Sequence, residues 1–312
     1  MFSIQICLFG RFTVNHRQAL VIALESAKEQ ELLSYLLIHH DRPHARETLA
    51  AMLWGENTTE KSKKYLRQAL WHVQTAFASV AEHFLAVEHD WVQFNMQPNV
   101  EVDVTKFEQA FLRARDVPGR QLDESAADEL RQAVETYRGG LLCGCYQDWC
   151  LLERERYQNM YLMILDKLLN YCAANHLYEA GQNYGELILR HDCAHERAHR
   201  RLMRLHYLAG DRTAALRQYE RCANVLRDEL GVIPDTHTEN LYRQICAAHT
   251  RTAPTANAAV APTTPNSMAE VLSRLKIAQQ SLSLAEQTLR REIKAIEDGL
   301  TASKDCDKTE PV

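Results

Sequence analysis

The sequence predicts a mainly α-helical protein with small β-sheets near its N-terminus. The chain has only 11 Gly and 8 Pro in 312 residues, which favours helices with short connections over a β-sandwich. Apolar residues recur at helical spacing over most of residues 27–248, whereas apolar alternation is confined to residues 4–14 and 84–96. A chain of this length can form two compact domains and an extension.

The overall composition is that of a soluble globular protein. It is 46% hydrophobic and 25% charged, with a net charge of −5. We expect neither a signal peptide nor a membrane span, because the N-terminus lacks a basic and apolar leader and no later stretch is long and apolar enough. Nine cysteines without a paired framework suit a reducing cytoplasm. With no glycine-rich phosphate loop, catalytic triad or carboxylate pair, we expect neither an enzyme nor a cofactor.

Residues 1–97 alternate between strand and helix patterns. The last helical pattern of this region places Leu66, Leu70 and Val73 on one stripe at helical spacing. The final hairpin pattern alternates around a polar tip, Glu88-His89-Asp90. The expected elements are strands over 4–14, bent at Gly10, and 19–24; helices over 27–41, 45–54 and 60–80; and a β-hairpin over 84–96.

Residues 98–249 are helical throughout and contain a weak internal repeat. Ala180 aligns with Ala215, and Tyr184 with Tyr219, at a separation of 35 positions. This separation is close to the period of about 34 residues of tetratricopeptide helix pairs. Gly231 and Pro234, the first and last residues of "GVIP", act as stop signals after the last repeat. The pattern therefore predicts a tetratricopeptide-like domain.

The C-terminal part is a linker, a single helix and a tail. Residues 250–267 are rich in Pro, Ala and Thr and predict a flexible linker. Residues 268–300 carry an apolar residue every seven positions, whereas residues 301–312 predict a disordered tail. The repeat fits a parallel coiled coil that joins protomers into a homo-oligomer, or a helix that packs back onto its own repeat domain. The seam residues are Leu275, Leu282, Leu289 and Ile296.

Three stretches carry a resemblance to a known family: "AKEQELLSYLLIHHDRPHARETLAAMLWGENTTEKSKKYLRQALWHVQTAF", "YRGGLLCGCYQDWCLLERERYQNMYLMILDKLLNYC" and "AHRRLMRLHYLAGDRTAALRQYERCANVLRDELGVIPDTHTENLYRQI". Over roughly residues 4–246 the chain resembles the SARP-type (antibiotic regulatory protein) transcriptional activators. The resemblance implies a winged helix-turn-helix DNA-binding domain over 1–97 and a bacterial transcriptional activator domain over 98–249. It also implies binding to direct repeats in double-stranded DNA upstream of promoters, and contact with RNA polymerase.

The candidate DNA-binding side chains lie mainly on the helix from about residue 59 to 79. Its apolar stripe faces inward, so its polar side chains face outward or flank the stripe, where a major groove could receive them. The alternative is a charged face that is only solvated. Arg46, at the start of the preceding helix, matches a phosphate-positioning location. The candidate residues are Lys61, Lys63, Lys64, Tyr65, Arg67, Gln68, His72, Arg46 and His89.

The charge of residues 1–97 argues against strong DNA binding. These residues hold nine Lys and Arg against ten Asp and Glu, a poor balance for attracting a phosphate backbone. The acidic tip around His89 also disfavours insertion of the hairpin into a minor groove. The rival interpretation is a tetratricopeptide-type protein-interaction scaffold with little specific DNA binding.

Two other patterns suggest metal or redox chemistry. His195, Glu196 and His199 have the H-E-x-x-H spacing of zinc peptidases. Arg197 lies inside that pattern, and a cation beside a dication is unfavourable, so we interpret it as the start of a repeat helix and expect no metal. Three further thiols predict core packing, with redox sensing as the alternative. They are Cys143, Cys145 and Cys150.

Overall fold

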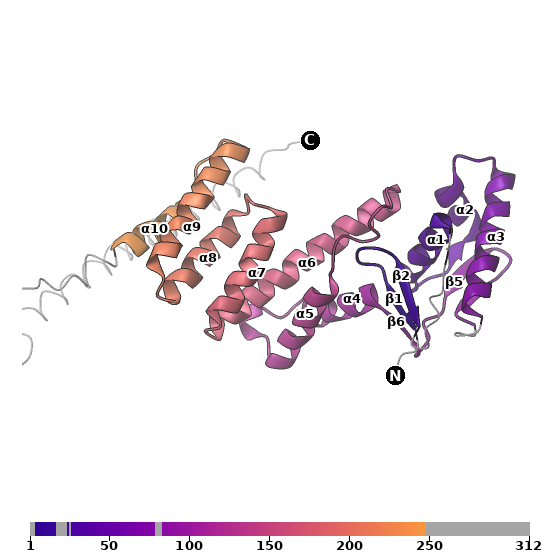
Figure 1. Ribbon diagram of the computed structural model, residues 1–312, viewed down its shortest axis with the longest axis horizontal. Helices are drawn as coiled ribbons and strands as arrows, with labels where there is room; N and C mark the ends of the chain where they lie inside the picture. Colours follow the sequence, from indigo (N-terminus) through magenta and orange to yellow (C-terminus); the bar gives the residue numbers. More distant parts are fainter. Residues whose placement is uncertain (1–3, 17–23, 25, 79–82, 248–312) are drawn as a thin grey trace, which may run out of the picture. The chain divides into compact units, whose positions relative to one another are not determined.

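The computed structural model describes residues 4–16, 24, 26–78 and 83–247 (Figure 1). Helices dominate this part of the chain, and two small sheets lie in its N-terminal region. The predicted fold class is therefore confirmed. Most of the strand expected over 19–24, and the predicted linker, heptad helix and tail, lie outside the described residues.

The first sheet joins the N-terminal strands to a strand far along the chain. Strand β1 (Ile4–Cys7) pairs antiparallel with β2 (Thr13–His16) and parallel with β6 (Val100–Val102). The turn after β1 contains Gly10 at φ +84°, a conformation that glycine adopts without steric cost. Because β6 leads directly into the first helix of residues 98–249, its parallel pairing with β1 attaches the first strand of the chain to that helical part.

Three helices and a second sheet follow. The stripe that the sequence predicts on the third helix is buried: Leu66, Leu70 and Val73 are almost inaccessible to solvent. This helix packs against the two before it. The helices are α1 (Ala27–Ile38), α2 (Arg46–Trp54) and α3 (Thr59–Phe77), and the sheet has the order β3 (His44–Ala45), β5 (Trp91–Phe94), β4 (Leu85–Val87).

The remaining elements are helical, and from α6 (Asp148–Ala174) onward each helix packs on the next, as the ladder of ribbons in Figure 1 shows. Gly231, at φ +67°, ends the last turn of the second repeat, as predicted. The elements are α4 (Asp103–Ala114), a 3-10 turn η1 (Gly119–Gln121), α5 (Glu124–Thr136), α6 (Asp148–Ala174), α7 (Tyr178–His191), α8 (Glu196–Leu208), α9 (Arg212–Val225), a π-helical turn η2 (Leu226–Leu230) and α10 (Thr236–Ala247).

The predicted repeat corresponds to two helical hairpins, α6–α7 and α8–α9. Two glycines of α7 let α8 approach closely. A Cβ on Gly185 would lie 2.5 Å from the Leu202 side chain, and one on Gly181 would lie 2.9 Å from Leu205. Since both leucines are fully buried, a larger residue at either glycine would separate the two hairpins.

The buried Asp103 carboxylate connects the first sheet to α4. Its two oxygens accept hydrogen bonds from the backbone N–H groups of Leu8 (2.9 and 2.8 Å), Phe9 (2.9 Å) and Val104 (2.7 Å). Burial raises the pKa of Asp103, and these N–H groups act in the opposite direction. The carboxylate also lies in the first turn of α4, where the helix dipole favours negative charge.

A second connection involves the start of α6. The Arg154 guanidinium donates hydrogen bonds to the carbonyl oxygens of Leu141, Leu142 and Cys145 at 2.9–3.0 Å. Trp149 packs edge-on against Tyr35 of α1, with ring centroids 5.3 Å apart. The Trp149 side chain is almost fully buried and belongs to the core.

The three clustered thiols lie beside this connection in different environments. Cys150 is buried, Cys145 is partly buried and Cys143 is exposed. A hydrogen bond between the two inner thiols lowers the pKa of Cys145 to about 7 and raises that of Cys150. Core packing therefore describes Cys150, whereas Cys143 lies at the surface.

We predict that Asp103→Ala destabilises the protein strongly. The substitution leaves three backbone N–H groups buried without an acceptor, each costing about 1–3 kcal/mol, so the free energy of unfolding should fall by about 3 kcal/mol or more. Asp103→Asn keeps one acceptor oxygen and should cost less. Urea unfolding measures both, with the exposed Asp41→Ala as control. A loss in Asp103→Ala no larger than in the control would contradict the role of this carboxylate.

Candidate nucleic-acid interface

The turn between α2 and α3 sets the direction of α3. The buried Ser62 hydroxyl donates to the carbonyl oxygen of Trp54 at 2.8 Å, which links the first turn of α3 to the end of α2. Thr58, the residue before α3, is in an extended conformation, so α2 and α3 do not form one continuous helix. With the apolar stripe of α3 packed inward, its opposite side is exposed along most of its length. We call this side the α3 face.

The α3 face carries three cations that have no carboxylate partner among the described residues. In the part of the chain that the structure describes, Lys61, Lys64 and Arg67 form no ion pair, whereas Lys63 pairs with Glu47 of α2 (Nζ to Oε1, 2.6 Å). Gln68 and Trp71 are exposed beside them, the tryptophan to 62%. Unpaired cations, an amide and an exposed ring are groups that can contact phosphates and base edges.

Four candidate residues surround a hollow of about 720 Å³ between α3, the start of α2 and the β4–β5 turn. They are Arg46, Lys63, Arg67 and His89. The Arg46 guanidinium donates to the carbonyl oxygen of Glu88 at 2.9 Å, and its backbone N–H to that of Asp90, also at 2.9 Å. Arg46 therefore holds the hairpin turn against α2. His89 is almost fully exposed and contacts the Asp90 carboxylate at 2.5 Å.

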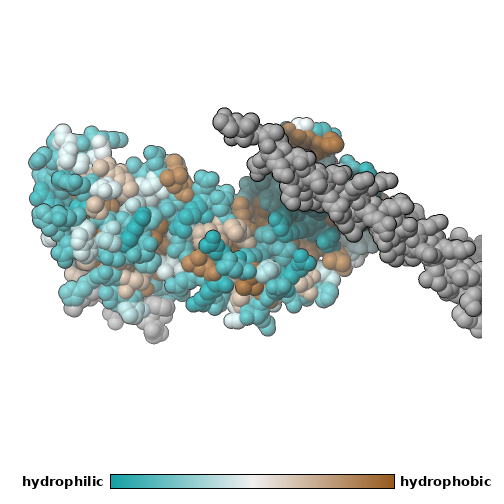
Figure 2. All heavy atoms as spheres, turned by 180° about the vertical axis from the view of Figure 1, so that it is seen from behind, coloured by the Kyte–Doolittle hydropathy of each residue, from teal (hydrophilic) through white to brown (hydrophobic). Residues whose placement is uncertain are grey.

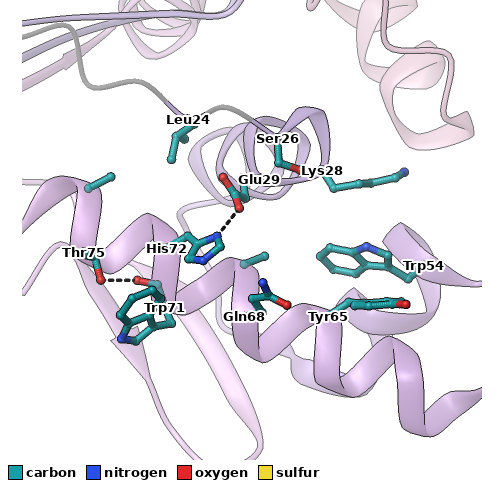
Figure 3. Close-up of a pocket in the computed structure, with 12 residues that line it drawn as sticks. Leu24, Ser26, Lys28, Glu29, Trp54, Tyr65, Gln68, Trp71, His72 and Thr75 are labelled. Carbon is teal, nitrogen blue, oxygen red and sulfur yellow. Dashed lines mark hydrogen bonds and ion pairs between the residues drawn. The ribbon is translucent and has the colours of Figure 1, made fainter.

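Three other candidates line a different hollow, of about 630 Å³, between α3 and the start of α1 (Figure 3). They are Tyr65, Gln68 and His72. The His72 ring points to Glu29 of α1, with Nδ1 2.5 Å from Oε1, and the Tyr65 ring lies beside Trp54. His72 is therefore engaged within the protein, while Tyr65 and Gln68 remain accessible.

The structure thus divides the predicted site. Lys61, Lys64, Arg67 and Gln68 lie on the α3 face without a side-chain partner among the described residues. Sequence reasoning missed the partners of the other residues, because Glu29 lies 43 positions before His72 and Glu47 lies 16 before Lys63. Such pairs follow no helical spacing. Trp71 could have been included, since the helical pattern already places it on the outer side.

The H-E-x-x-H residues have structural roles at the start of α8. His199 is 1% exposed, its Nε2 lies 2.9 Å from the carbonyl oxygen of Cys193 and its Nδ1 lies 2.7 Å from the Gln218 amide nitrogen. A neutral ring satisfies both contacts, donating from Nε2 and accepting at Nδ1. His195 Nδ1 accepts from the N–H of Ala198, capping the helix. A metal ion at His199 would have to break one of its two hydrogen bonds.

The third residue of this pattern also bonds within the protein. The Glu196 carboxylate accepts from the backbone N–H of Asp235 at 2.7 Å, which connects α8 to the segment before α10. Among the residues that the structure describes, no group of three metal-binding side chains comes together. The interpretation of "HERAH" as the start of a repeat helix is confirmed, since α8 begins at Glu196.

Comparison with known proteins agrees with this architecture. Residues 102–246 match the family model of the bacterial transcriptional activator domain. A solved structure of Mycobacterium tuberculosis EmbR in complex with a low-affinity phosphopeptide has a similar fold, with a TM-score of 0.68 and 17% sequence identity. The match covers 80% of this chain and 66% of the EmbR chain, slightly less than two thirds of it. No curated protein matches the sequence.

The domain match defines the class of residues 102–246 as a bacterial transcriptional activator domain, and the fold of the chain is similar to that of EmbR. The predicted resemblance is therefore confirmed. None of the described helices combines the length and apolar character needed to cross a lipid bilayer. On the face seen in Figure 2, the surface of the described residues is mostly hydrophilic with scattered apolar patches.

We predict that the contribution of His199 to stability depends on pH. Burial lowers the pKa of His199 below its ordinary value of 6.5. Below pH 6.5 the unfolded chain therefore binds a proton that the folded state does not. The free energy of unfolding then decreases as the pH is lowered. His199→Asn should cost about 2 kcal/mol at pH 7.5, and the difference from the unsubstituted protein should narrow toward pH 5.5. Urea unfolding at both pH values, with the exposed His237→Asn as control, measures this. A constant or widening difference would show that His199 is not buried in its neutral form.

Proposed function

We propose that the protein is a sequence-specific DNA-binding regulator, and that it activates transcription from promoters with direct repeats upstream. The observation that carries this is the α3 face, where Lys61, Lys64, Arg67 and Gln68 are exposed and have no partner within the described residues. The bacterial transcriptional activator domain over residues 102–246 supports the regulatory role. The DNA-binding domain would comprise residues 1–97 and the activator domain residues 98–249.

In this proposal α3 lies in the major groove. Arg67 and Lys64 would reach guanine edges, Gln68 would pair with adenine, and Lys61 would contact a phosphate. Lys63 would contribute less, because Glu47 neutralises it. Arg46 would contribute mainly by holding the β4–β5 turn, and His72 by fixing α3 against α1.

The β4–β5 turn would contribute little to DNA affinity. Glu88 and Asp90 flank His89 there, and an acidic turn is repelled by the phosphate backbone. A single protomer would then bind DNA weakly. Several protomers on direct repeats would compensate, because linked sites multiply their affinities.

The partners that follow from this proposal are duplex DNA, RNA polymerase and other copies of the chain, in the cytoplasm. Helical repeats offer extended surfaces to protein partners, so the stack from α6 to α10 would contact the polymerase. The seam Leu275, Leu282, Leu289 and Ile296 would join protomers as a coiled coil.

A second candidate function is a protein-interaction scaffold. Two observations favour it: the acidic β4–β5 turn and the neutralised Lys63. The two functions differ in salt dependence, because phosphate contacts release counterions and a protein interface need not.

We predict that the double variant Lys64→Ala/Gln68→Ala loses specific promoter binding. Both side chains are exposed, so the melting temperature should stay the same. Losing a base-specific contact costs about 1–3 kcal/mol, so the two together should lower affinity for the cognate site at least tenfold, measured by DNase footprinting and fluorescence anisotropy. Gln132→Ala/Arg217→Ala removes one amide and one cation elsewhere on the exposed surface and serves as the matched control.

An unchanged footprint in the Lys64/Gln68 variant would remove α3 as the reader of DNA sequence. The cognate site itself comes from selection of bound sequences from a random duplex library. A titration of salt from 50 to 200 mM then tests the scaffold alternative. Affinity for duplex DNA should fall steeply with salt, whereas absent binding, or binding insensitive to salt, would favour the scaffold.

We predict that deleting residues 268–312 lowers the oligomeric state. The deletion removes the seam residues Leu275, Leu282, Leu289 and Ile296, whose burial in a coiled coil would join protomers. Light scattering should report a smaller mass for the truncated chain at the same protein concentration. The matched control replaces Gln279 and Glu286, two polar residues four positions after Leu275 and Leu282, with Ala, which should keep or raise the mass. Equal masses for the full and truncated chains would contradict the coiled coil.

A further inference from the structure

A cationic groove lies within residues 98–249, and none of its lining residues belongs to the α3 face. It has a volume of about 680 Å³ and lies between the η1 turn, the middle of α6 and the start of α8. Four of the side chains that line it are cations, and one is a carboxylate, Asp166. The cations are Arg120, Lys167, Arg197 and Arg201.

Two of the four cations are already engaged. The Lys167 ammonium donates to the carbonyl oxygens of Arg115 (3.0 Å) and Val117 (2.6 Å), and so holds the segment before η1. Arg201 forms an ion pair with Asp166. Asp116, on the same segment, attracts Lys167. The two carboxylates near the groove, Asp116 and Asp166, therefore face Lys167 and Arg201, the two cations that already have partners within the protein.

The other two cations have no such partner. Within the described residues, Arg120 and Arg197 form no ion pair and donate no side-chain hydrogen bond. Burial lowers the pKa of Arg201, and the nearby charge of Arg120 lowers it further. Guanidinium groups that repel one another across a groove are stabilised when an anion lies between them.

The backbone that carries Arg120 packs closely on α6. Arg120 follows Gly119, whose Cβ, if present, would lie 2.5 Å from the carbonyl oxygen of Lys167. Only glycine allows the η1 turn to pack this closely on α6. The backbone of Arg120 is therefore fixed before an anion binds, and only its side chain has to be ordered on binding.

The start of α8 adds to the positive potential. His195 caps this helix of 13 residues, and Arg197 and Arg201 lie in its first two turns beside the groove. The N-terminal end of a helix carries a partial positive charge that favours anions. The one acidic side chain of the first turn, Glu196, is occupied by the N–H of Asp235.

We propose that this cationic groove binds a small polyphosphate, either inorganic pyrophosphate or the phosphate chain of a nucleotide. Guanidinium groups bind phosphate oxygens in pairs of hydrogen bonds, and Arg120 and Arg197 are free to do so. The volume lies within the range of about 300–1,000 Å³ of small-molecule sites. Among the described residues, no Phe, Tyr or Trp lines the groove, so the phosphates, and not a stacked base, are what it recognises.

Isothermal titration of the full-length protein with inorganic pyrophosphate tests this proposal. Pyrophosphate should bind more tightly than orthophosphate, and Arg120→Ala/Arg197→Ala should weaken its binding at least tenfold. Arg204→Ala/Arg217→Ala removes two exposed cations that do not line the groove, and it should bind pyrophosphate like the unsubstituted protein. Equal affinities in the two double variants, or no binding of pyrophosphate, would overturn the proposal.

Two further measurements identify the source of the phosphate and exclude DNA. ATP without a divalent ion should bind at least as tightly as pyrophosphate. If ATP binds more tightly than pyrophosphate, the ligand is a nucleotide. If the two affinities are equal, the groove recognises the phosphate chain alone. Promoter DNA should bind to the Arg120/Arg197 variant as it does to the unsubstituted protein. If DNA affinity falls and pyrophosphate affinity does not, the cluster belongs to the DNA interface and the groove is not a small-anion site. The Lys64/Gln68 variant should retain pyrophosphate binding, so failure of one proposal leaves the other testable.

Discussion

The buried Asp103 carboxylate is the constraint on which the arrangement of the described chain depends. It lies where β6 ends and α4 begins, and it accepts hydrogen bonds from two N–H groups just after β1. The N-terminal strands therefore belong to the same hydrogen-bonded unit as the helical region. Arg154, bonded to three carbonyl oxygens, and Trp149, packed on Tyr35, extend this connection to α1 and α6.

The exposed face of α3 is a consequence of what its other face buries. Leu66, Leu70 and Val73 fill the space against α1 and α2, and the remaining side chains must face outward. Carboxylates from neighbouring helices then reduce that surface, because Glu29 engages His72 and Glu47 engages Lys63. Some of the acidic residues of residues 1–97 thus hold α3 in place by pairing with its side chains. Fewer cations of α3 then remain available to a ligand.

The helices and their inward faces were predictable, whereas the partners of the site residues were not. Helical spacing identified α1, α2, α3 and the two repeat hairpins, since each depends on residues three or four positions apart. The β4–β5 hairpin followed from its alternation around Glu88-His89-Asp90. The parallel pairing of β1 with β6 had no local signal, because the paired residues, such as Ile4 and Val100, are 96 positions apart and only the folded chain brings them together.

By itself, the sequence determined the fold class, the repeat register, the end of η2 at Gly231 and the outward side of α3, because these depend on local periodicity and on backbone preferences of single residues. Only the tertiary structure decided which charges are free. Arg46 and His72 are held by distant groups, while Arg120 and Arg197 converge from separate elements on one groove. Electrostatic interactions act through space and are independent of position in the chain, so no spacing in the sequence encodes them.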